Sequence, residues 1–271
     1  MAAKKPVGTV TRGTTNPNRL RRVDRYVCAL PTLRRVENPI VVDLGYGASP
    51  ITAVELLARC KTVNSQTRLV GVEIERERVE RGLAVATDDL RFTLGGFETP
   101  LPPDFGTGTR VDIIRAFNVL RQYDESEVAA AWALMQGRLS DSGLLIEGTC
   151  DEIGRVSTWV AITPDGPQSL SLSLKLDALD APSIAAERLP KVLIHRNVPG
   201  ESIHRFMVEL DRAWKTHAPL SNFGAIQRWI ATVETMKANG WPVIGGRTRW
   251  RLGEITVAWD AVAPLGFSLR D

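Results

Sequence analysis

The stretch PIVVDLGYGASP, residues 39–50, decides the fold. Its apolar run ends at Leu44 and is followed at once by Gly45 and Gly47. A short β-branched run that stops at glycines is typical of a fully buried parallel strand followed by a tight turn. Pro50 suits the first position of a helix, where its missing N–H would have no partner in any case. The stretch therefore predicts a strand, a glycine turn and a helix, in that order.

The same alternation continues downstream. Further strand-like runs and helical patterns follow in turn, at residues 69–74, 75–86, 91–94, 111–117, 126–139 and 144–147. Strands that alternate with helices indicate a parallel sheet, in which every strand-to-helix turn lies at the same edge. We predict an α/β fold: a Rossmann-like, mostly parallel sheet with helices on both faces.

The flanking segments complete the predicted organisation. We expect residues 20–30 to form an amphipathic helix that is capped by Asn18 and turns Arg21, Arg22 and Arg25 away from the core. Late in the chain we expect an antiparallel hairpin of residues 156–163 and 169–176, helices at 202–216 and 222–238, and strands at 247–252 and 254–259. This predicts a basic N-terminal arm and helix (1–37), a Rossmann-like domain (38–176) and a helical C-terminal appendage or lid packed on the same domain (177–271).

Composition and charge restrict the class of protein. Apolar residues make up 44% and charged residues 24%, as in ordinary globular proteins. The net charge is +3, but residues 1–36 alone carry +8, so this arm is suited to phosphates or an acidic substrate. Without an apolar run long enough for a signal or a membrane span, we expect a cytoplasmic protein with no membrane partner. Three scattered cysteines and three unpaired histidines predict no metal site.

The glycine turn points to a nucleoside ligand. Gly45 and Gly47 leave no side chain between the backbone and a ligand that lies across the strand end. About thirty residues after Asp43, Glu73 ends the next strand, where its carboxylate can accept both hydroxyls of a ribose. Pro50 disfavours a dinucleotide, which needs a small residue there so that the helix N-terminus can close on a pyrophosphate. A positively charged sulfonium cofactor agrees better with the acidic Asp43.

At these residues the sequence resembles the class I S-adenosylmethionine-dependent methyltransferases, and among them uncharacterised bacterial members. Their first motif is an acid followed by G-x-G-x-G, and the resemblance covers about residues 38–150. It implies S-adenosylmethionine as the cofactor, with different parts of the cofactor held by Asp43, Gly45, Tyr46, Gly47, Glu73, Ile74, Gly96 and Phe97. Two positions depart from the pattern: Ser49 stands at the third glycine, and Gly96 stands where many members place an acid.

Candidates for contact with the methyl acceptor follow two strands. Asn118, Arg121 and Tyr123 come after the strand 111–117, and Glu147, the candidate general base, comes at the end of the strand 144–147. The loop 115–123 lacks the [D/N]-P-P-[Y/F] pattern of amino-methylating families, which argues against chemistry of the adenine-N6 type, and transfer to O, N or C stays open. The acceptor stays open between a small molecule and RNA, and a homo-oligomer is compatible with the sequence.

Two other functions compete with methyl transfer. One is a nicotinamide-dependent oxidoreductase, and the other is a noncatalytic protein that binds the cofactor or nucleic acid. Trp229, Trp241 and Trp250, with the arginines at 247, 249 and 251, suit base stacking, but core packing explains the same residues.

Overall fold

The computed structural model describes residues 5–106 and 108–267, and the chain forms two compact units. The first unit contains the chain up to Glu147 together with residues 152–154 and 162–166. The second contains most of the chain from Gly148 onward. Residues 1–4 of the predicted basic arm lie outside the described part. The three-part division at residues 37 and 176 stays a prediction.

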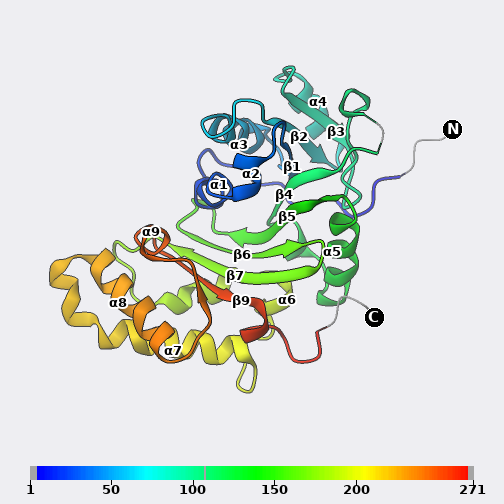
Figure 1. The fold of residues 1–271 in the computed structure, drawn as a ribbon. Coiled ribbons are helices and arrows are strands. Elements are labelled where there is room, and N and C mark those ends of the chain that lie inside the picture. Colours follow the sequence, from blue (N-terminus) through cyan, green and yellow to red (C-terminus); the bar gives the residue numbers. More distant parts are fainter. Residues whose placement is uncertain (1–4, 107, 268–271) are drawn as a thin grey trace. The chain divides into compact units, whose positions relative to one another are not determined.

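Parallel strands form the centre of the first unit (Figure 1). The strands lie in the order β3-β2-β1-β4-β5, and β1 pairs in parallel with both β2 and β4, as β2 does with β3. Their bounds are β1 Ile40–Leu44, β2 Arg68–Glu73, β3 Leu90–Leu94, β4 Val111–Phe117 and β5 Leu139–Cys150. Every residue of β1 and β4 is buried, which agrees with their mostly apolar sequences. The predicted Rossmann-like sheet is confirmed.

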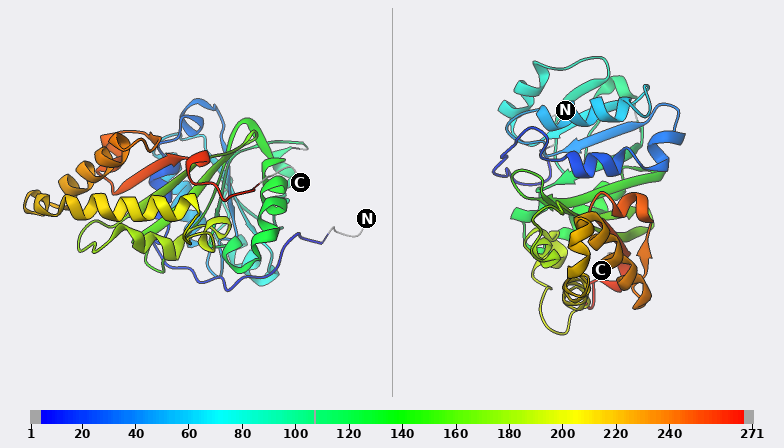
Figure 2. Two further views of the ribbon diagram at one scale, coloured as in Figure 1. Left: turned by 90° about the horizontal axis from the view of Figure 1, so that it is seen from below. Right: turned by 90° about the vertical axis from the view of Figure 1, so that its left-hand side faces the viewer.

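Helices connect these strands and cover the sheet. α3 (Ile51–Lys61) joins β1 to β2 and α4 (Arg76–Leu83) joins β2 to β3, whereas α5 (Val128–Gln136) joins β4 to β5 on the other side of β1. Since strand-helix-strand crossovers are right-handed, connections that run in opposite directions place their helices on opposite faces. These connections can be followed in Figures 1 and 2.

The segment before β1 differs in detail from the prediction. α1 (Arg21–Val27) begins three residues after Asn18, whose φ of 59° is left-handed, and a second helix, α2 (Pro31–Arg35), begins at Pro31. Arg22 was expected to face solvent, and this was wrong: its side chain is buried and its Nε donates to the carbonyl of Gly154 at 3.0 Å. The described residues 5–16 form neither helix nor strand and run as an extended segment, dark blue in Figure 2.

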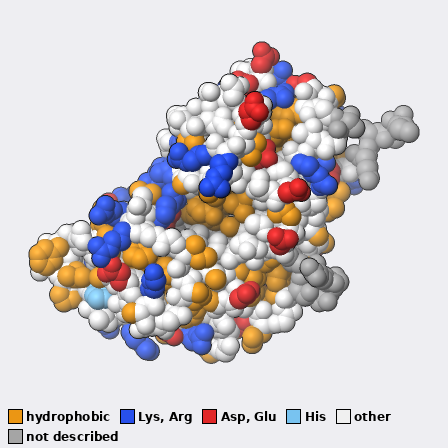
Figure 3. All heavy atoms as spheres, in the orientation of Figure 1, with side chains coloured by type: hydrophobic (Ala, Val, Ile, Leu, Met, Phe, Trp, Pro, Cys, Tyr) orange, Lys and Arg blue, Asp and Glu red, His pale blue; other side chains and the backbone are white. Residues whose placement is uncertain are grey.

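The second unit is an antiparallel sheet with helices. Its strands lie in the order β6-β7-β9-β8, and β9 pairs antiparallel with both β7 and β8. The bounds are β6 Val156–Thr163, β7 Gly166–Leu174, β8 Val243–Ile244, β9 Glu254–Ala258, α6 Lys191–Ile194, α7 Ser202–Thr216, α8 Ala225–Ala238 and α9 Arg247–Trp250. Short 3₁₀ helices of the two units lie at Pro103–Phe105, Leu120–Gln122, Glu125–Glu127, Pro182–Arg188, Ala218–Phe223 and Trp259–Ala261. The side chains of Phe223 and Ile226 are exposed where the chain passes from α7 to α8. Figure 3 shows hydrophobic side chains at the surface of the left-hand end of the molecule.

Two expectations about this unit are corrected. The strand predicted at residues 247–252 was wrong, because α9 forms there between Gly246 and Gly253. The hypothesis that tryptophans stack on bases fails as well. Trp229, Trp241 and Trp250 are all buried, and the indole N–H of Trp229 donates to a backbone carbonyl. None of the helices in the described residues is both long enough and apolar enough to cross a membrane.

Candidate functional site

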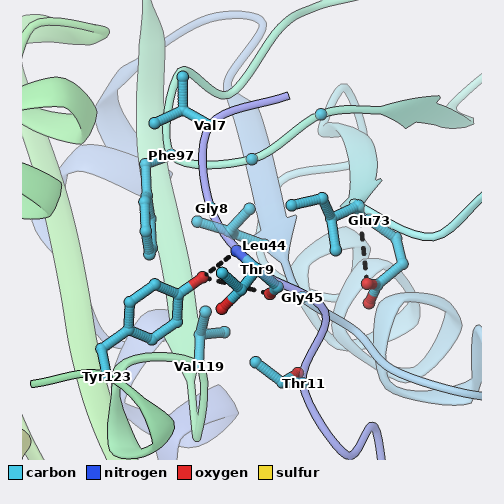
Figure 4. Close-up of a pocket in the computed structure, with 13 residues that line it drawn as sticks. Val7, Gly8, Thr9, Thr11, Leu44, Gly45, Glu73, Phe97, Val119 and Tyr123 are labelled. Atoms are coloured by element: carbon cyan, nitrogen blue, oxygen red, sulfur yellow. Dashed lines mark hydrogen bonds between the residues drawn. The ribbon is translucent and has the colours of Figure 1, made fainter. Parts of the chain in front are cut away.

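The carboxyl ends of four parallel strands meet at one edge of the first unit. β1 leads into Gly45, β2 ends at Glu73, β3 leads into Gly95 and Gly96, and β4 leads into Asn118. The in-register pairing of the strands brings these positions together. The groove at this edge, shown in Figure 4, is lined by six of the predicted residues, namely Gly45, Glu73, Ile74, Gly96, Phe97 and Tyr123. The other predicted residues, Asp43, Tyr46, Gly47, Asn118, Arg121 and Glu147, are not among those that line it.

The glycine loop after β1 permits close approach, as its sequence indicates. Gly45 and Gly47 have φ values of 69° and 87°, which L-residues with side chains rarely adopt. A Cβ atom on Gly45 would lie 2.5 Å from a methyl group of Val119. On Gly47 it would lie 2.5 Å from the hydroxyl of Thr15 and 2.7 Å from the carbonyl oxygen of Gly13. In this structure the atoms that approach the loop belong to the protein itself.

Glu73 ties the loop to the end of β2. Its carboxylate is buried, and its two oxygens accept hydrogen bonds from the backbone N–H of Gly47 at 2.9 Å and of Ile74 at 3.0 Å. The guanidinium of Arg78 lies 3.4 Å from the same carboxylate and also pairs with Glu75. Arg78 was missed by sequence reasoning, although its position five residues after Glu73, on the helix that follows β2, was a usable signal.

The loop after β3 presents backbone donors to the groove. The N–H of Phe97 donates to the carbonyl of Val7 at 3.0 Å, and the N–H of Gly96 donates to Glu98 at 3.0 Å. The other carboxylate oxygen of Glu98 accepts from the N–H of Val7 at 2.9 Å. A Cβ atom on Gly96 would lie 1.8 Å from the carbonyl oxygen of Val7. Gly96 is therefore required by the backbone that crosses it.

Tyr123 is the acceptor-side candidate that reaches the groove. Its ring packs edge-on against Phe97 at 5.2 Å between centroids, and its hydroxyl accepts from the N–H of Thr9 at 2.6 Å. Asn118 adopts a left-handed φ of 61° directly after β4, and Arg121 is half-buried in the 3₁₀ helix Leu120–Gln122. The roles proposed for these three residues stay predictions.

Asp43 and Tyr46 point away from the groove. The Tyr46 hydroxyl donates to the carbonyl of Arg78 at 2.8 Å, and its ring packs edge-on against Phe92. Asp43 pairs with Arg115 on the neighbouring strand, and the Thr52 hydroxyl donates to it at 3.1 Å. The negative charge of Asp43, which the sequence argument directed at a cationic cofactor, is therefore balanced inside the fold.

Arg115 is the centre of a buried ionic network that the sequence did not reveal. Its guanidinium is fully buried and donates to Asp43 and to Asp24 of α1. Arg59 of α3 also pairs with Asp24. Burial raises the pKa of Asp24, and the two arginines act against this rise. The network holds α1 against β4 and α3, and its signal in the sequence was an arginine in the middle of a buried strand.

Glu147 lies at the end of the β5 segment that belongs to the first unit. Its carboxyl group is fully buried, and burial raises its pKa to about 8, while the Trp132 indole acts weakly in the opposite direction. A carboxyl group with this pKa exchanges its proton near neutral pH, as a general base must. Its assignment as a base stays a prediction.

The groove is filled by residues 5–15, which we call the N-terminal arm. In Figure 4, Val7, Gly8, Thr9 and Thr11 cross in front of the loop after β1 and beside Phe97 and Tyr123. With the arm in place the remaining cavity is about 20 Å³, whereas pockets for organic ligands typically measure about 300–1,000 Å³. The groove therefore has no room for a nucleoside while the arm occupies it.

Comparisons with known proteins give likenesses of structure. No protein-family model and no curated protein sequence matches this chain. One similar solved structure is an S-adenosylmethionine-dependent methyltransferase of Leishmania major, 16% identical, with a TM-score of 0.37, covering 49% of this chain and 50% of that one. The CcbJ methyltransferase of Streptomyces caelestis is 15% identical over 60% of this chain and 74% of that one, with a TM-score of 0.38. The chain thus spans about half the length of the first of these proteins.

Proposed function

We propose that the chain is an S-adenosylmethionine-dependent methyltransferase whose cofactor occupies the groove at the carboxyl edge of the first unit. The observation that carries the proposal is the placement of three features along one groove: the glycine loop after β1, the carboxylate of Glu73 and the backbone N–H of Phe97. The resemblance of residues 38–150 to class I methyltransferases assigns the same three positions to the methionine, ribose and adenine parts. The proposal leaves the methyl acceptor open between a small molecule and RNA.

The residues present fit such a cofactor. Gly45 and Gly96 leave space beside the backbone that a Cβ atom at either position would fill. The N–H of Phe97 already donates to a carbonyl oxygen, so an acceptor atom on a base suits the same place. Glu73 is held by two backbone N–H groups, so its remaining lone pairs are oriented for ribose hydroxyls.

The chemistry asked of the protein is mainly alignment and exclusion of water. When bound, S-adenosylmethionine supplies an activated methyl group, and its transfer is an in-line displacement that gains most from correct approach. Val119, Phe97 and Tyr123 form an apolar wall beside the glycine loop, which suits a site that excludes water. The Tyr123 hydroxyl is the polar group of that wall and is positioned to orient an acceptor.

The nicotinamide alternative receives less support. α3 begins at Ile51, directly after Pro50, which supplies no N–H to a phosphate. The N–H of Ile51 itself donates to the Ser49 hydroxyl at 3.4 Å. This helix N-terminus therefore offers few donors to a pyrophosphate.

Calorimetric titration with S-adenosylmethionine, S-adenosylhomocysteine and NADH tests the proposal. We expect the two sulfur nucleosides to bind and NADH to give no heat of binding. Glu73→Gln should weaken their binding about 10- to 100-fold, because hydrogen bonds to charged groups are the stronger ones. Glu75→Gln is the matched control, since Glu75 also pairs with Arg78 but is not among the groove-lining residues, and it should stay within about twofold of the wild type. Binding of NADH alone would reverse the assignment.

A further inference from the structure

We propose that the N-terminal arm and the cofactor compete for the same groove, so that cofactor binding releases the arm. This inference rests on the proposed function. It assigns residues 5–15 the role of a built-in plug that occupies the nucleoside site when the cofactor is absent. The inference is supported by three sets of contacts, by the size of the groove and by the anchoring of the chain after the arm.

The first contacts lie at the place assigned to the adenine. The Val7 carbonyl accepts from the N–H of Phe97 at 3.0 Å, and the Val7 N–H donates to Glu98 at 2.9 Å. An amide that presents an acceptor and a donor side by side offers the same pattern as the edge of an adenine ring. The arm thus satisfies the groups that a base would otherwise satisfy.

The second contacts lie over the acceptor side of the groove. The Tyr123 hydroxyl accepts from the N–H of Thr9 and donates to the carbonyl of Thr9. Next to it, the N–H of Arg12 donates to the side chain of Gln122 at 3.2 Å. While these bonds are present, the hydroxyl of Tyr123 is occupied by the arm and is withheld from an acceptor.

The third contacts lie over the glycine loop. The carbonyl of Gly13 accepts from the N–H of Ala48 at 2.8 Å, and the Thr15 hydroxyl donates to the carbonyl of Tyr46 at 3.0 Å. The carbonyl of Thr11 accepts from Arg78 at 2.8 Å. Because Arg78 also pairs with Glu73, arm and ribose-binding carboxylate share one cation.

Simultaneous occupancy is excluded by volume. The cavity of about 20 Å³ that remains beside the arm holds about one water molecule. S-adenosylmethionine therefore enters only when Val7, Gly8 and Thr9 leave. A ligand and a segment that exclude each other in this way are coupled reciprocally, so each lowers the apparent affinity of the other.

The contacts of the arm with the groove are of a kind that breaks and re-forms easily. Its contacts are backbone hydrogen bonds and small side chains, and the side chains of Val7 and Val10 remain exposed. Such bonds exchange for bonds to water with little net change, and segments that bury few apolar groups open readily. Differential affinity of the cofactor for the open groove is then sufficient to displace the arm.

The part of the chain that can leave the groove ends before Asn18, which is anchored to α3. The N–H of Asn18 donates to both carboxylate oxygens of Glu55 on α3, at 2.9 and 3.0 Å, and its side chain accepts from Arg59 at 2.7 Å. Beyond it, Asp24 is bound by Arg115 and Arg59. The arm is therefore tethered to a fixed point beside its groove, so it returns when the cofactor leaves.

Two glycines of the arm provide a test that leaves the groove intact. Gly8 and Gly13 have φ values of 132° and 69°, and an added Cβ would lie 2.9 Å from the Tyr123 hydroxyl and 2.6 Å from the Arg78 guanidinium, respectively. The double variant Gly8→Ala, Gly13→Ala should therefore loosen the arm. Gly224→Ala in the second unit is the control, because its φ is 99° but its surroundings are open. Calorimetry with S-adenosylhomocysteine should show about tenfold tighter binding by the double variant and no change in the control.

Amide hydrogen exchange of the full-length wild type gives the second readout. Saturating S-adenosylhomocysteine should accelerate exchange at Val7, Thr9 and Arg12, whose N–H groups donate to the side chains of Glu98, Tyr123 and Gln122 in this structure. If the nucleoside instead slows exchange there, and the double variant binds it equally or more weakly, the arm is a lid over the cofactor and the competition is overturned. If neither protein binds the nucleoside, the proposed function fails and the competition fails with it.

Discussion

Arg115 on β4 and Asp43 on β1 face each other across neighbouring strands, and the guanidinium donates to both carboxylate oxygens at 2.9 and 2.6 Å. Both side chains are buried, and Asp24 of α1 completes the contact from the other side. The pair consequently stabilises the packing of α1 on the sheet. Asp43 is therefore paired inside the fold, whereas Glu73, which lines the groove, is paired with Arg78.

Removing Arg115 should destabilise the protein strongly. Arg115→Met leaves Asp43 and Asp24 buried without their shared cation, and loss of one partner of a buried pair costs about 3–5 kcal/mol. Urea unfolding gives the free energy. The matched control is Arg91→Met, because Arg91 pairs with exposed Asp88 at the surface, where such a pair is worth about 1 kcal/mol or less. Equal losses in the two variants would show that the buried network contributes nothing beyond a surface pair.

Glu147 should make stability depend on pH. Burial raises its pKa from 4.5 to about 8 in the folded protein. Between these values the folded chain keeps a proton that the unfolded chain releases, so the free energy of unfolding falls as pH rises. Relative to Glu147→Gln, the wild type should lose up to about 4 kcal/mol of its free energy of unfolding between pH 4.5 and pH 8. Urea titrations at several pH values give this difference, and parallel profiles for the two proteins would refute the assignment.

Cys28 should be the most reactive of the three thiols. A hydrogen bond from the Cys60 thiol lowers the pKa of Cys28, which is half-buried, whereas that bond and burial raise the pKa of Cys60. Cys150 is buried. Because the thiolate is the nucleophile, iodoacetamide should modify Cys28 at least about tenfold faster than the other two. Peptide mass spectrometry follows each site. Faster labelling of Cys60 or Cys150 would contradict the interpretation of this pair.

The sheet was predictable because its signals are local. A fully buried parallel strand is mostly apolar, so short runs rich in β-branched and other apolar residues indicated the positions of β1 and β4. The strand predicted at residues 247–252 was wrong because its local signal was misleading. Its alternation of arginines with other residues suits a strand, but the few residues between Gly246 and Gly253 form a helical turn that buries Trp250.

The site was predictable only where it depends on strand ends. Gly45, Glu73 and Phe97 each stand at such an end, so their convergence follows from the parallel register. The arm carries no comparable signal, because the contact of Val7 with Phe97 joins segments far apart in the sequence and uses backbone atoms, which every residue has. The pairing of Arg115 with Asp43 is likewise a tertiary contact, although an arginine in a buried strand predicts that some carboxylate must be near.

The same substitution at two tyrosines should have different effects, because Tyr46 is part of the core and Tyr123 contacts the arm in the groove. Tyr46→Phe leaves the buried carbonyl of Arg78 without the hydroxyl that donates to it, so we expect a loss of about 1–3 kcal/mol in urea unfolding. Tyr123→Phe removes the hydroxyl that binds Thr9, an exposed residue of the arm that water can solvate, so stability should change by less than about 1 kcal/mol. Amide exchange should instead respond, rising at Thr9 in Tyr123→Phe and staying unchanged there in Tyr46→Phe. If Tyr123→Phe destabilised the protein as much as Tyr46→Phe and left exchange at Thr9 unaltered, the arm would be a fixed part of the fold rather than a segment seated reversibly in the groove.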